Sequence, residues 1–284
     1  MDSLKDRIVV VTGSTRGLGY AIAAAMLEAG ATVVLSGRSE AGLQRALASL
    51  RGAGPVEGLV CDVREERQVY ALARQAAARH GRIDVWVNNA GYSASAGRML
   101  DTPPGRAIDM FLANDMGTLY GAQAALHFMR PRHEGMLVNL YGAGAFLRPA
   151  SPTGLYGASK AWAASFTRTL AEEIRGSGVR LLGFSPGMLL TDMLTAPAVV
   201  GEAGRDMMKS YGFVLRMLAS DPGQAAGRLV AAVARQRAEF AELRLFKPWT
   251  PLAGLLRIAW ENVTGTGRRP AFDLRYEPAY EPEI

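Results

Sequence analysis

The sequence alternates short apolar segments with longer amphipathic ones, and this alternation constrains the fold more than any other feature. The apolar segments, rich in β-branched residues, predict strands at 8–11, 33–35, 58–61, 85–87, 137–140 and 181–184. Between them lie helical patterns, such as 39–50 and 65–79, that keep one face apolar. Strands that alternate with helices form a parallel sheet, and right-handed crossovers place helices on both of its faces. The sequence therefore predicts a doubly wound, Rossmann-type α/β fold of about seven strands.

The domain organisation follows from where this alternation stops. No repeat or linker divides the 284 residues before about residue 195, which predicts one domain over 5–246. Within it, the mixed, Met-rich segment 195–220 is typical of a substrate lid, although packing helices explain the same composition. Residues 247–284 are expected to form a C-terminal extension, with an amphipathic helix around Trp249–Trp260 and an irregular, proline-rich end from Glu277 onward.

Composition limits the location and the partners of the chain. A single cysteine, Cys61, cannot form an internal disulfide, and the first residues lack the pattern of a signal peptide, so we expect a cytoplasmic protein. No apolar run is long enough to span a bilayer, but the extension leaves peripheral membrane contact open. The net charge of +6 is scattered along the chain, so no nucleic-acid partner is expected.

The first predicted strand runs into a glycine-rich turn and then a helix. Glycines allow a tight turn and close approach of the backbone to a dinucleotide phosphate, and the helix N-terminus offers free N–H groups to the anion. This pattern predicts a dinucleotide site, whereas a turn without a ligand is the simpler alternative. The residues concerned are Gly13, Ser14, Thr15, Arg16, Gly17, Leu18 and Gly19.

The end of the second strand indicates which dinucleotide is bound. The segment Ser36-Gly37-Arg38 has an arginine where an acidic residue would grip the ribose hydroxyls of NAD. Arg38 and Arg16 can instead clamp a 2′-phosphate, because a guanidinium matches phosphate geometry. We therefore expect NADP(H) as the cofactor, although an exposed arginine at a strand end needs no ligand.

Two further strand ends fall where the same cofactor would need them. Asp62, followed by Val63, can accept a hydrogen bond from the adenine amine. The segment Asn89-Ala90-Gly91 lets the backbone pass close to the ribose. Each could be an ordinary turn, but their positions at consecutive carboxyl ends favour a shared ligand.

A tyrosine and a lysine four residues apart supply the candidate chemistry. Tyr156 and Lys160 share one face of the predicted helix 154–175, so the ammonium lies beside the phenol. A free phenol has a pKa near 10, and a neighbouring cation favours its ionised form. Tyr156 is therefore a candidate general acid or base, although such pairs are usually surface residues.

These motifs together resemble the short-chain dehydrogenase/reductase family. The glycine turn, the segment Asn88–Gly91, Asn114 and the Tyr156/Lys160 pair stand in the order and spacing of that family over roughly residues 5–195. The resemblance implies that Asn114 holds a water in a proton relay and that Lys160 binds the nicotinamide ribose while lowering the pKa of Tyr156.

The resemblance also assigns the segment after the sixth strand and the quaternary structure. It implies that the nicotinamide lies against Pro186, Gly187 and Met188, with Thr191 near its carboxamide. It further implies a homo-oligomer, a dimer or a tetramer, joined across the helices at 105–130 and 154–175, although core burial accounts for their apolar faces nearly as well.

One departure from the family concerns the substrate-orienting serine. The family places it after the fifth strand, but Gly142 and Ala143 occupy the equivalent positions here. Losing a comparable donor costs on the order of 10²–10³ in rate, so another hydroxyl is expected to substitute or the substrate to need less polarisation. The candidate substitutes are Tyr141, Ser151 and Thr153, each of which also has a simple structural explanation.

The chlorophyll(ide) b reductases and their bacterial relatives show the same gap. The chain resembles this subgroup at segments 61–65 and 83–91, at 142–144 with Arg148-Pro149, and at 185–188, and the likeness continues through Lys247-Pro248 and Arg268-Arg269. Members of the subgroup reduce a formyl group on a large, flat, apolar pigment. The resemblance therefore implies a hydrophobic carbonyl substrate.

The leading hypothesis is thus an NADP(H)-dependent oxidoreductase that reduces an aldehyde or ketone, with Tyr156, Lys160 and Asn114 as the catalytic residues. The alternative is a binding or regulatory protein that keeps the fold and NADP with little or no catalysis. His80, His127, His133 and the single cysteine show no metal-ligand spacing, so no metal is expected.

Overall fold

Seven parallel strands form the central sheet, in the order β3-β2-β1-β4-β5-β6-β8. The computed structural model describes residues 3–147, 149–266 and 271–282. The strand order reverses between β1 and β4, and in open sheets the carboxyl ends of the strands at such a reversal border the ligand crevice. The strands are β1 (Ile8–Val11), β2 (Thr32–Gly37), β3 (Val56–Val60), β4 (Val85–Asn88), β5 (Gly135–Leu140), β6 (Val179–Ser185) and β8 (Phe240–Arg244).

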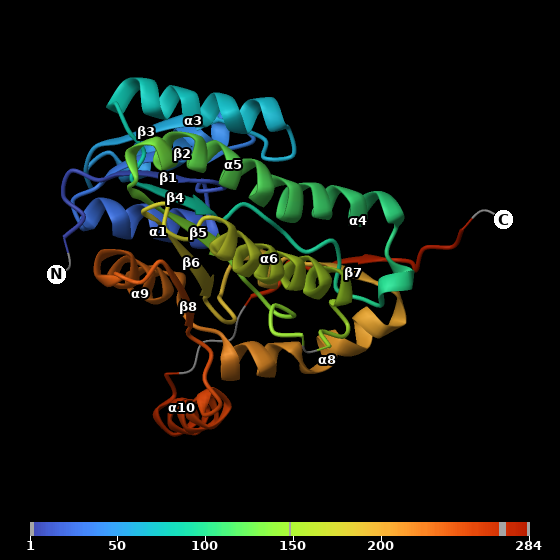
Figure 1. Cartoon of the computed structure of the whole chain (residues 1–284). Coiled ribbons are helices and arrows are strands. Elements are labelled where there is room, and N and C mark those ends of the chain that lie inside the picture. The colour runs from blue at the N-terminus through green and yellow to red at the C-terminus, as the bar shows by residue number, and fades with distance from the viewer. Residues whose placement is uncertain (1–2, 148, 267–270, 283–284) are drawn as a thin grey trace.

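Helices cover both faces of this sheet, which makes the doubly wound fold expected from the sequence (Figure 1). One face packs against α1 (Gly17–Glu28), α2 (Glu40–Leu50) and α9 (Pro222–Arg235). The other packs against α3 (Glu66–His80), α5 (Gly117–Met129) and α6 (Gly154–Glu173). Because the central strands are covered on both sides, all four residues of β1 are apolar and buried.

The central sheet and the helices that cover it differ from the sequence-based prediction in two places. β8 was not among the predicted strands, because as an edge strand it alternates apolar with charged residues and stays partly exposed. The helix predicted over 105–130 is interrupted: α4 (Pro104–Phe111) and α5 are joined by a π-helical turn, η2 (Leu112–Met116). Such turns widen a helix locally and are frequent at functional sites.

The predicted lid segment contains regular structure. The chain passes from α7 (Asp192–Thr195) through the short strand β7 (Ala198–Val200) into α8 (Gly201–Leu218). β7 bridges to Ala96 on one side, through hydrogen bonds of 2.8 and 3.0 Å between backbone groups of Ala96, Ala198 and Val200. The lid segment is thereby attached to the loop that follows β4.

The C-terminal extension folds back onto the rest of the chain. Its helix α10 (Thr250–Thr264) packs on α8, and β9 (Arg275–Glu277) pairs in parallel with β7. Glu277, expected to begin an irregular end, is thus the last residue of a strand. Arg148 and Arg268-Arg269 lie outside the described residues. Among the described helices, none is both long and apolar enough to cross a membrane.

Candidate active site

The glycine turn lies at the carboxyl edge of the sheet, between β1 and α1. Gly13 and Gly17 have φ of +62° and +57°, a backbone conformation that residues with a side chain rarely adopt. A Cβ on Gly13 would lie 2.8 Å from Cα of Ala90, so the turn packs directly against the end of β4. The first turn of α1 has no side-chain cap and no acidic residue. This uncapped helix N-terminus, preceded by a glycine turn, fits a dinucleotide phosphate.

Two residues predicted to bind the cofactor also hold the glycine turn in place. Ser14 donates through Oγ to the Val11 carbonyl at 2.8 Å and through its backbone N–H to the Ser36 carbonyl at 2.9 Å, so both of its donors are occupied. Asn89 donates through Nδ2 to the carbonyls of Thr12 and Gly13 at 2.9 and 3.2 Å. Their side chains therefore tie β1 to β2 and to β4.

The residues predicted to recognise a 2′-phosphate differ in accessibility. Arg16 and Arg38 are exposed, and Arg16 forms an exposed ion pair with Asp192 at 3.1 Å. Ser36 is fully buried and its hydroxyl has no hydrogen-bond partner among the described residues. A ligand at the surface can therefore reach the two arginines but not the Ser36 side chain.

Asp62 is engaged by a neighbouring arginine that the sequence analysis did not assign. Arg64 donates to both carboxylate oxygens of Asp62, at 2.7 to 3.1 Å, and also to Asp109 at 3.0 Å. Burial acts to raise the pKa of Asp62, but the hydrogen bonds and charge of Arg64, with a contribution from Arg38, lower it. Asp62 is therefore a carboxylate with its acceptors already in use. Val63 beside it is buried against Gly117.

The end of β4, the π-helical turn and α6 bring the predicted catalytic residues together. A Cβ on Gly91 would lie 2.7 Å from Oδ1 of Asn114 and 3.8 Å from Nζ of Lys160. Asn114 is fixed by its amide, which donates to the Tyr92 carbonyl and to Oγ of Ser159, each at 3.0 Å. Because Ala90 touches Gly13, this cluster and the glycine turn share one edge of the sheet.

The phenol of Tyr156 lies against the backbone at Gly142. A Cβ on Gly142 would be 2.6 Å from the Tyr156 hydroxyl and 3.0 Å from Cγ of Lys160. Gly142 therefore occupies the position at which the family's serine would face the tyrosine, and it supplies no hydroxyl there. Nζ of Lys160 lies 5.6 Å from the centre of the Tyr156 ring and donates to the Leu140 carbonyl at 3.2 Å.

None of the three candidate substitutes for the serine faces Tyr156 through its hydroxyl. Tyr141 is buried against Gly183 of β6, and its hydroxyl has no partner among the described residues. Thr153 donates to the Ala150 carbonyl at 3.0 Å. Ser151 is exposed and lines a surface pocket.

Burial has the largest effect on the pKa values of Tyr156 and Lys160. It raises the pKa of Tyr156 to about 12 and lowers the pKa of Lys160 to about 8, the latter against the charge of Asp115. The pKa of Tyr156 is thus raised, whereas the sequence-based expectation was a lowered pKa. The ammonium of Lys160 does not offset the effect of burial, because it lies over the ring and donates its hydrogen bond to a carbonyl rather than to the phenol.

Asp115 is a member of this cluster that the sequence analysis missed. It follows Asn114 in the π-helical turn, is 7% exposed, and its Oδ1 has no hydrogen-bond partner among the described residues. Burial raises its pKa to about 7, against the charge of Lys160. Nothing in the sequence distinguishes this aspartate from a solvated one, since its burial depends on the packing of α6 against the π-helical turn.

The segment predicted to border the nicotinamide follows β6. Gly187 has φ of +82°, Pro186 is buried, and Met188 accepts from the Ser220 N–H at 3.0 Å. A Cβ on Gly17 would lie 3.6 Å from Cγ2 of Thr191, so this segment returns to the glycine turn. The structure thus places the segment at the same sheet edge.

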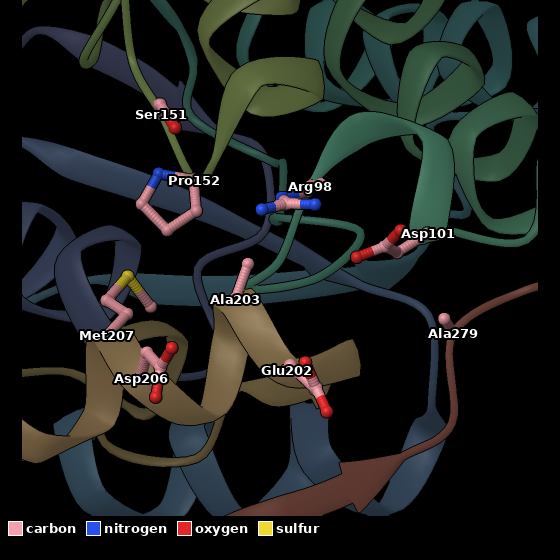
Figure 2. A pocket seen from close by; sticks show the side chains of 9 residues that line it. All are labelled: Arg98, Asp101, Ser151, Pro152, Glu202, Ala203, Asp206, Met207 and Ala279. Atoms are coloured by element: carbon pink, nitrogen blue, oxygen red, sulfur yellow. The ribbon is translucent and has the colours of Figure 1, made fainter.

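A separate pocket of about 710 Å³ opens between the lid segment and the residues that precede α6 (Figure 2). Acidic side chains and one arginine gather around it, and none of Tyr156, Lys160 and Asn114 lines it. The pocket is therefore separate from the candidate catalytic residues. Its lining residues are Arg98, Asp101, Ser151, Pro152, Glu202, Ala203, Asp206, Met207 and Ala279.

Comparison with known families identifies the arrangement. Residues 7–198 match the family model described as short chain dehydrogenase. The chain belongs to the short-chain dehydrogenase family. Membership of this family supports an oxidoreductase activity for the chain.

Similar proteins of this family include a chloroplast enzyme and bacterial oxidoreductases. The chain is 34% identical over 203 residues to chlorophyll(ide) b reductase NOL of Oryza sativa subsp. japonica, covering 69% of this chain and 59% of that protein. The chain thus spans about three-fifths of the length of this relative. It is 36% identical over 196 residues to an uncharacterized oxidoreductase of Staphylococcus aureus strain N315, covering 69% of this chain and 84% of that protein.

Solved structures of other short-chain dehydrogenases share the fold. A metagenomic short-chain oxidoreductase in complex with NADP is 28% identical, with a TM-score of 0.67 over 85% of this chain and 96% of that one. Levodione reductase is 26% identical, with a TM-score of 0.73 over 84% of this chain and 96% of that one.

Proposed function

We propose that this short-chain dehydrogenase uses NADPH to reduce an aldehyde or ketone to an alcohol. The observation that carries the proposal is the convergence of Tyr156, Lys160 and Asn114 at the sheet edge that also holds the glycine turn. When bound there, the cofactor would supply the hydride that reduces the carbonyl carbon. The chain's own residues must then deliver a proton to the carbonyl oxygen.

The ionisation of the cluster suits the reductive direction. With a pKa raised to about 12, Tyr156 is protonated at neutral pH and can donate its phenol proton to the carbonyl oxygen. Lys160, with a pKa lowered to about 8, can return a proton to the phenolate, because it exchanges protons close to neutral pH. Asn114 would hold the water that links Lys160 to solvent.

The cofactor preference is proposed from Arg38 and Arg16. Both are exposed: Arg16 lies in the glycine turn, and Arg38 follows β2 at the position where NAD-binding folds carry a carboxylate. A similar oxidoreductase was solved in complex with NADP, which supports the same choice. NADP(H) is therefore the proposed cofactor.

The proposed substrate is a large hydrophobic carbonyl compound, such as the formyl group of a chlorophyll-type pigment. The likeness to chlorophyll(ide) b reductase supports this class. Exposed apolar side chains near the nicotinamide segment, Leu190, Met193 and Phe246, support it as well. Because the chain is also similar to bacterial oxidoreductases that are described only as uncharacterized, the proposal includes other aldehydes and ketones as substrates.

The test is NADPH consumption by the full chain across a panel of aldehydes and ketones that includes chlorophyll b. Replacing Tyr156→Phe removes the proton donor and should lower kcat by about 10²–10⁴-fold. Tyr141→Phe is the matched control, because that phenol faces Gly183 and should not affect turnover. Equal activity of wild type and Tyr156→Phe would overturn the role of the phenol.

A second candidate is an NADP-binding protein with little or no catalysis, acting as a binding or regulatory module. The glycine at position 142 favours it, because this residue faces the Tyr156 hydroxyl and has no hydroxyl of its own to orient a carbonyl. Tight NADPH binding without turnover on the whole panel would support this candidate over the reductase.

A further inference from the structure

Helix α10 presents a continuous apolar face to solvent. The apolar side chains of this face recur at spacings of three and four residues, which places them on one side of the helix. Each is between 46% and 83% exposed. This apolar stripe consists of Trp249, Leu252, Leu255, Leu256, Trp260 and Val263.

The opposite side of α10 is fixed to the lid helix α8, so the exposure of the stripe is not the result of a loosely placed helix. Gly254 packs on the backbone of Met217, and Ile258 is only 8% exposed. Arg257 donates to the Arg216 carbonyl at 2.5 Å, and Glu261 pairs with Arg216 at 3.0 Å. These polar contacts hold α10 with its stripe outward.

The charges around the stripe favour an anionic surface over another apolar protein surface. Glu261 is the only acidic residue in segment 246–264, and it is turned inward to Arg216 and Arg257. Lys247 is exposed at the start of α10, and Arg257 is about half exposed on its flank. Exposed tryptophans beside basic residues are typical of helices that lie in the headgroup region of a membrane.

The stripe is also connected to the candidate active site. Phe246, 44% exposed, immediately precedes α10, and its Cβ would lie 3.7 Å from a Cβ on Gly187. Gly187 belongs to the segment proposed to border the nicotinamide. Phe246 therefore places the start of α10 next to the segment proposed to border the nicotinamide.

From these observations we propose that the apolar stripe of α10 docks the protein onto an anionic lipid surface. Docking buries the tryptophans and leucines in the headgroup region, while Lys247 meets lipid phosphates and the half-exposed Arg257 adds positive charge beside the stripe. A hydrophobic carbonyl substrate can then enter from the lipid. This last step rests on the proposed function, whereas docking itself does not.

The experiment is flotation of the full chain with vesicles of phosphatidylcholine alone or with phosphatidylglycerol added, without cofactor or substrate. Wild type should float with the anionic vesicles, and added salt should weaken the binding, because it screens the basic residues. The triple variant Leu252→Gln/Leu256→Gln/Trp260→Gln should bind at least about tenfold more weakly. The control Leu100→Gln, at an 89% exposed leucine outside α10, should float like wild type.

A second readout follows the tryptophans directly. Of the four tryptophans, Trp86 is fully buried and Trp162 is stacked on Phe166 in α6, away from the stripe. A blue shift of the emission on adding anionic vesicles should therefore disappear in Trp249→Phe/Trp260→Phe, whereas a shift that persists in this variant would come from Trp162 and would count against docking by the stripe. NADPH turnover of a water-soluble aldehyde should be unchanged in both stripe variants, which separates docking from catalysis. Failure of wild type to float, or equal flotation of the triple variant, would overturn the proposal. So would a lower oligomeric state of the triple variant in lipid-free buffer, because the stripe would then bind a second copy.

Discussion

Lys160 and Asp115 form a buried pair in which each residue opposes the effect of burial on the other. Burial lowers the pKa of the lysine and raises that of the aspartate, while their mutual attraction acts in the reverse direction on both. Such a pair costs stability, because at least one of its members is desolvated in its charged form. Asp115 also follows Asn114 directly in the chain, and its charge raises the pKa of Lys160, which is a member of the proposed proton relay.

Replacing Asp115→Asn should therefore stabilise the protein more at high pH than at low pH. The pKa of Asp115 rises from 3.8 to about 7 on folding, so ionisation penalises the folded state as the pH increases through this range. We expect the melting temperature to rise by about 2–4 °C at pH 8 and by less at pH 5. Thermal denaturation at both pH values measures this. The exposed control Glu173→Gln should shift little at either pH, and equal gains for Asp115→Asn at both would contradict the prediction.

Replacing Arg38→Asp should change the choice of cofactor. Loss of a charge-assisted hydrogen bond to a 2′-phosphate costs about 1.5–3 kcal/mol, or roughly 10- to 100-fold in affinity. We expect the Kd for NADPH to increase by that factor while the Kd for NADH changes much less. Titration by tryptophan fluorescence measures both. Arg45→Asp, which makes the same charge change on the exposed side of α2, is the control, and equal effects on the two cofactors would argue against a phosphate clamp.

At this scale, residues whose roles follow from local spacing could be predicted from the sequence. The spacing placed Tyr156 and Lys160 side by side, because residues four apart on a helix share one face, while their catalytic roles were expected from the family resemblance and stay predictions. The buried state of Asp115 and the ion pair of Arg64 with Asp62 could not be found, because both depend on contacts between distant elements or on side-chain geometry. Ser14 and Asn89 were assigned to the cofactor, but their side chains stabilise the turn that would bind it.

At the scale of elements, the last described residues fasten the lid segment. β9 extends the contact that β7 makes with Ala96, and the Tyr280 N–H donates to the Asp101 carbonyl at 2.8 Å. Arg106 of α4 pairs with Glu277 at 2.7 Å, and Phe272 contacts the ring of Tyr211 in α8. The tail therefore connects α8, β7 and the loop before α4.

Deleting residues 271–284 should loosen the lid segment without removing the cofactor site. We expect the KM for the carbonyl substrate to rise several-fold and the Kd for NADPH to stay near its wild-type value. Limited proteolysis should cut within 195–220 faster, because an unpaired β7 opens more often. Deletion of 281–284 is the matched control, since it keeps β9 and Tyr280. Unchanged KM and proteolysis in the longer deletion would show that β7 needs no partner.

Strand and helix elements could be predicted where burial is uniform. The strands β1, β2, β4, β5 and β6 have apolar sequences because both faces of the sheet are covered. β8 and β9 were not predicted. β8 is an edge strand and β9 has only three residues, and both carry charged residues toward solvent, so neither has the apolar sequence of a buried strand. The π-helical turn has no sequence pattern distinct from α-helix, since it is set by packing against α6.

At the scale of the whole molecule, α4, the π-helical turn and α6 leave an apolar surface outward. Ile108 is 60% exposed, and Trp162 stacks on Phe166 with ring centres 4.9 Å apart. A pocket of about 340 Å³ lies here, with Asp115 among its lining residues. Family resemblance and this surface together lead us to expect a homodimer joined across these helices.

The double variant Ile108→Glu/Trp162→Ala should therefore shift the chain from dimer to monomer. A carboxylate on this surface would have to be desolvated at the interface, which disfavours association. Light scattering coupled to size-exclusion chromatography measures the mass. Leu100→Glu adds the same charge outside these helices and should leave the mass unchanged, whereas a monomeric wild type would refute the expected interface.

The pairing of β9 with β7 has a consequence for biosynthesis. Translation produces residues 8–191, which contain the glycine turn, Tyr156 and Lys160, well before residues 271–282 leave the ribosome. A nascent chain can therefore assemble its nucleotide-binding edge before β9 is available to pair with β7. The lid segment is thus fixed after the nucleotide-binding edge has formed.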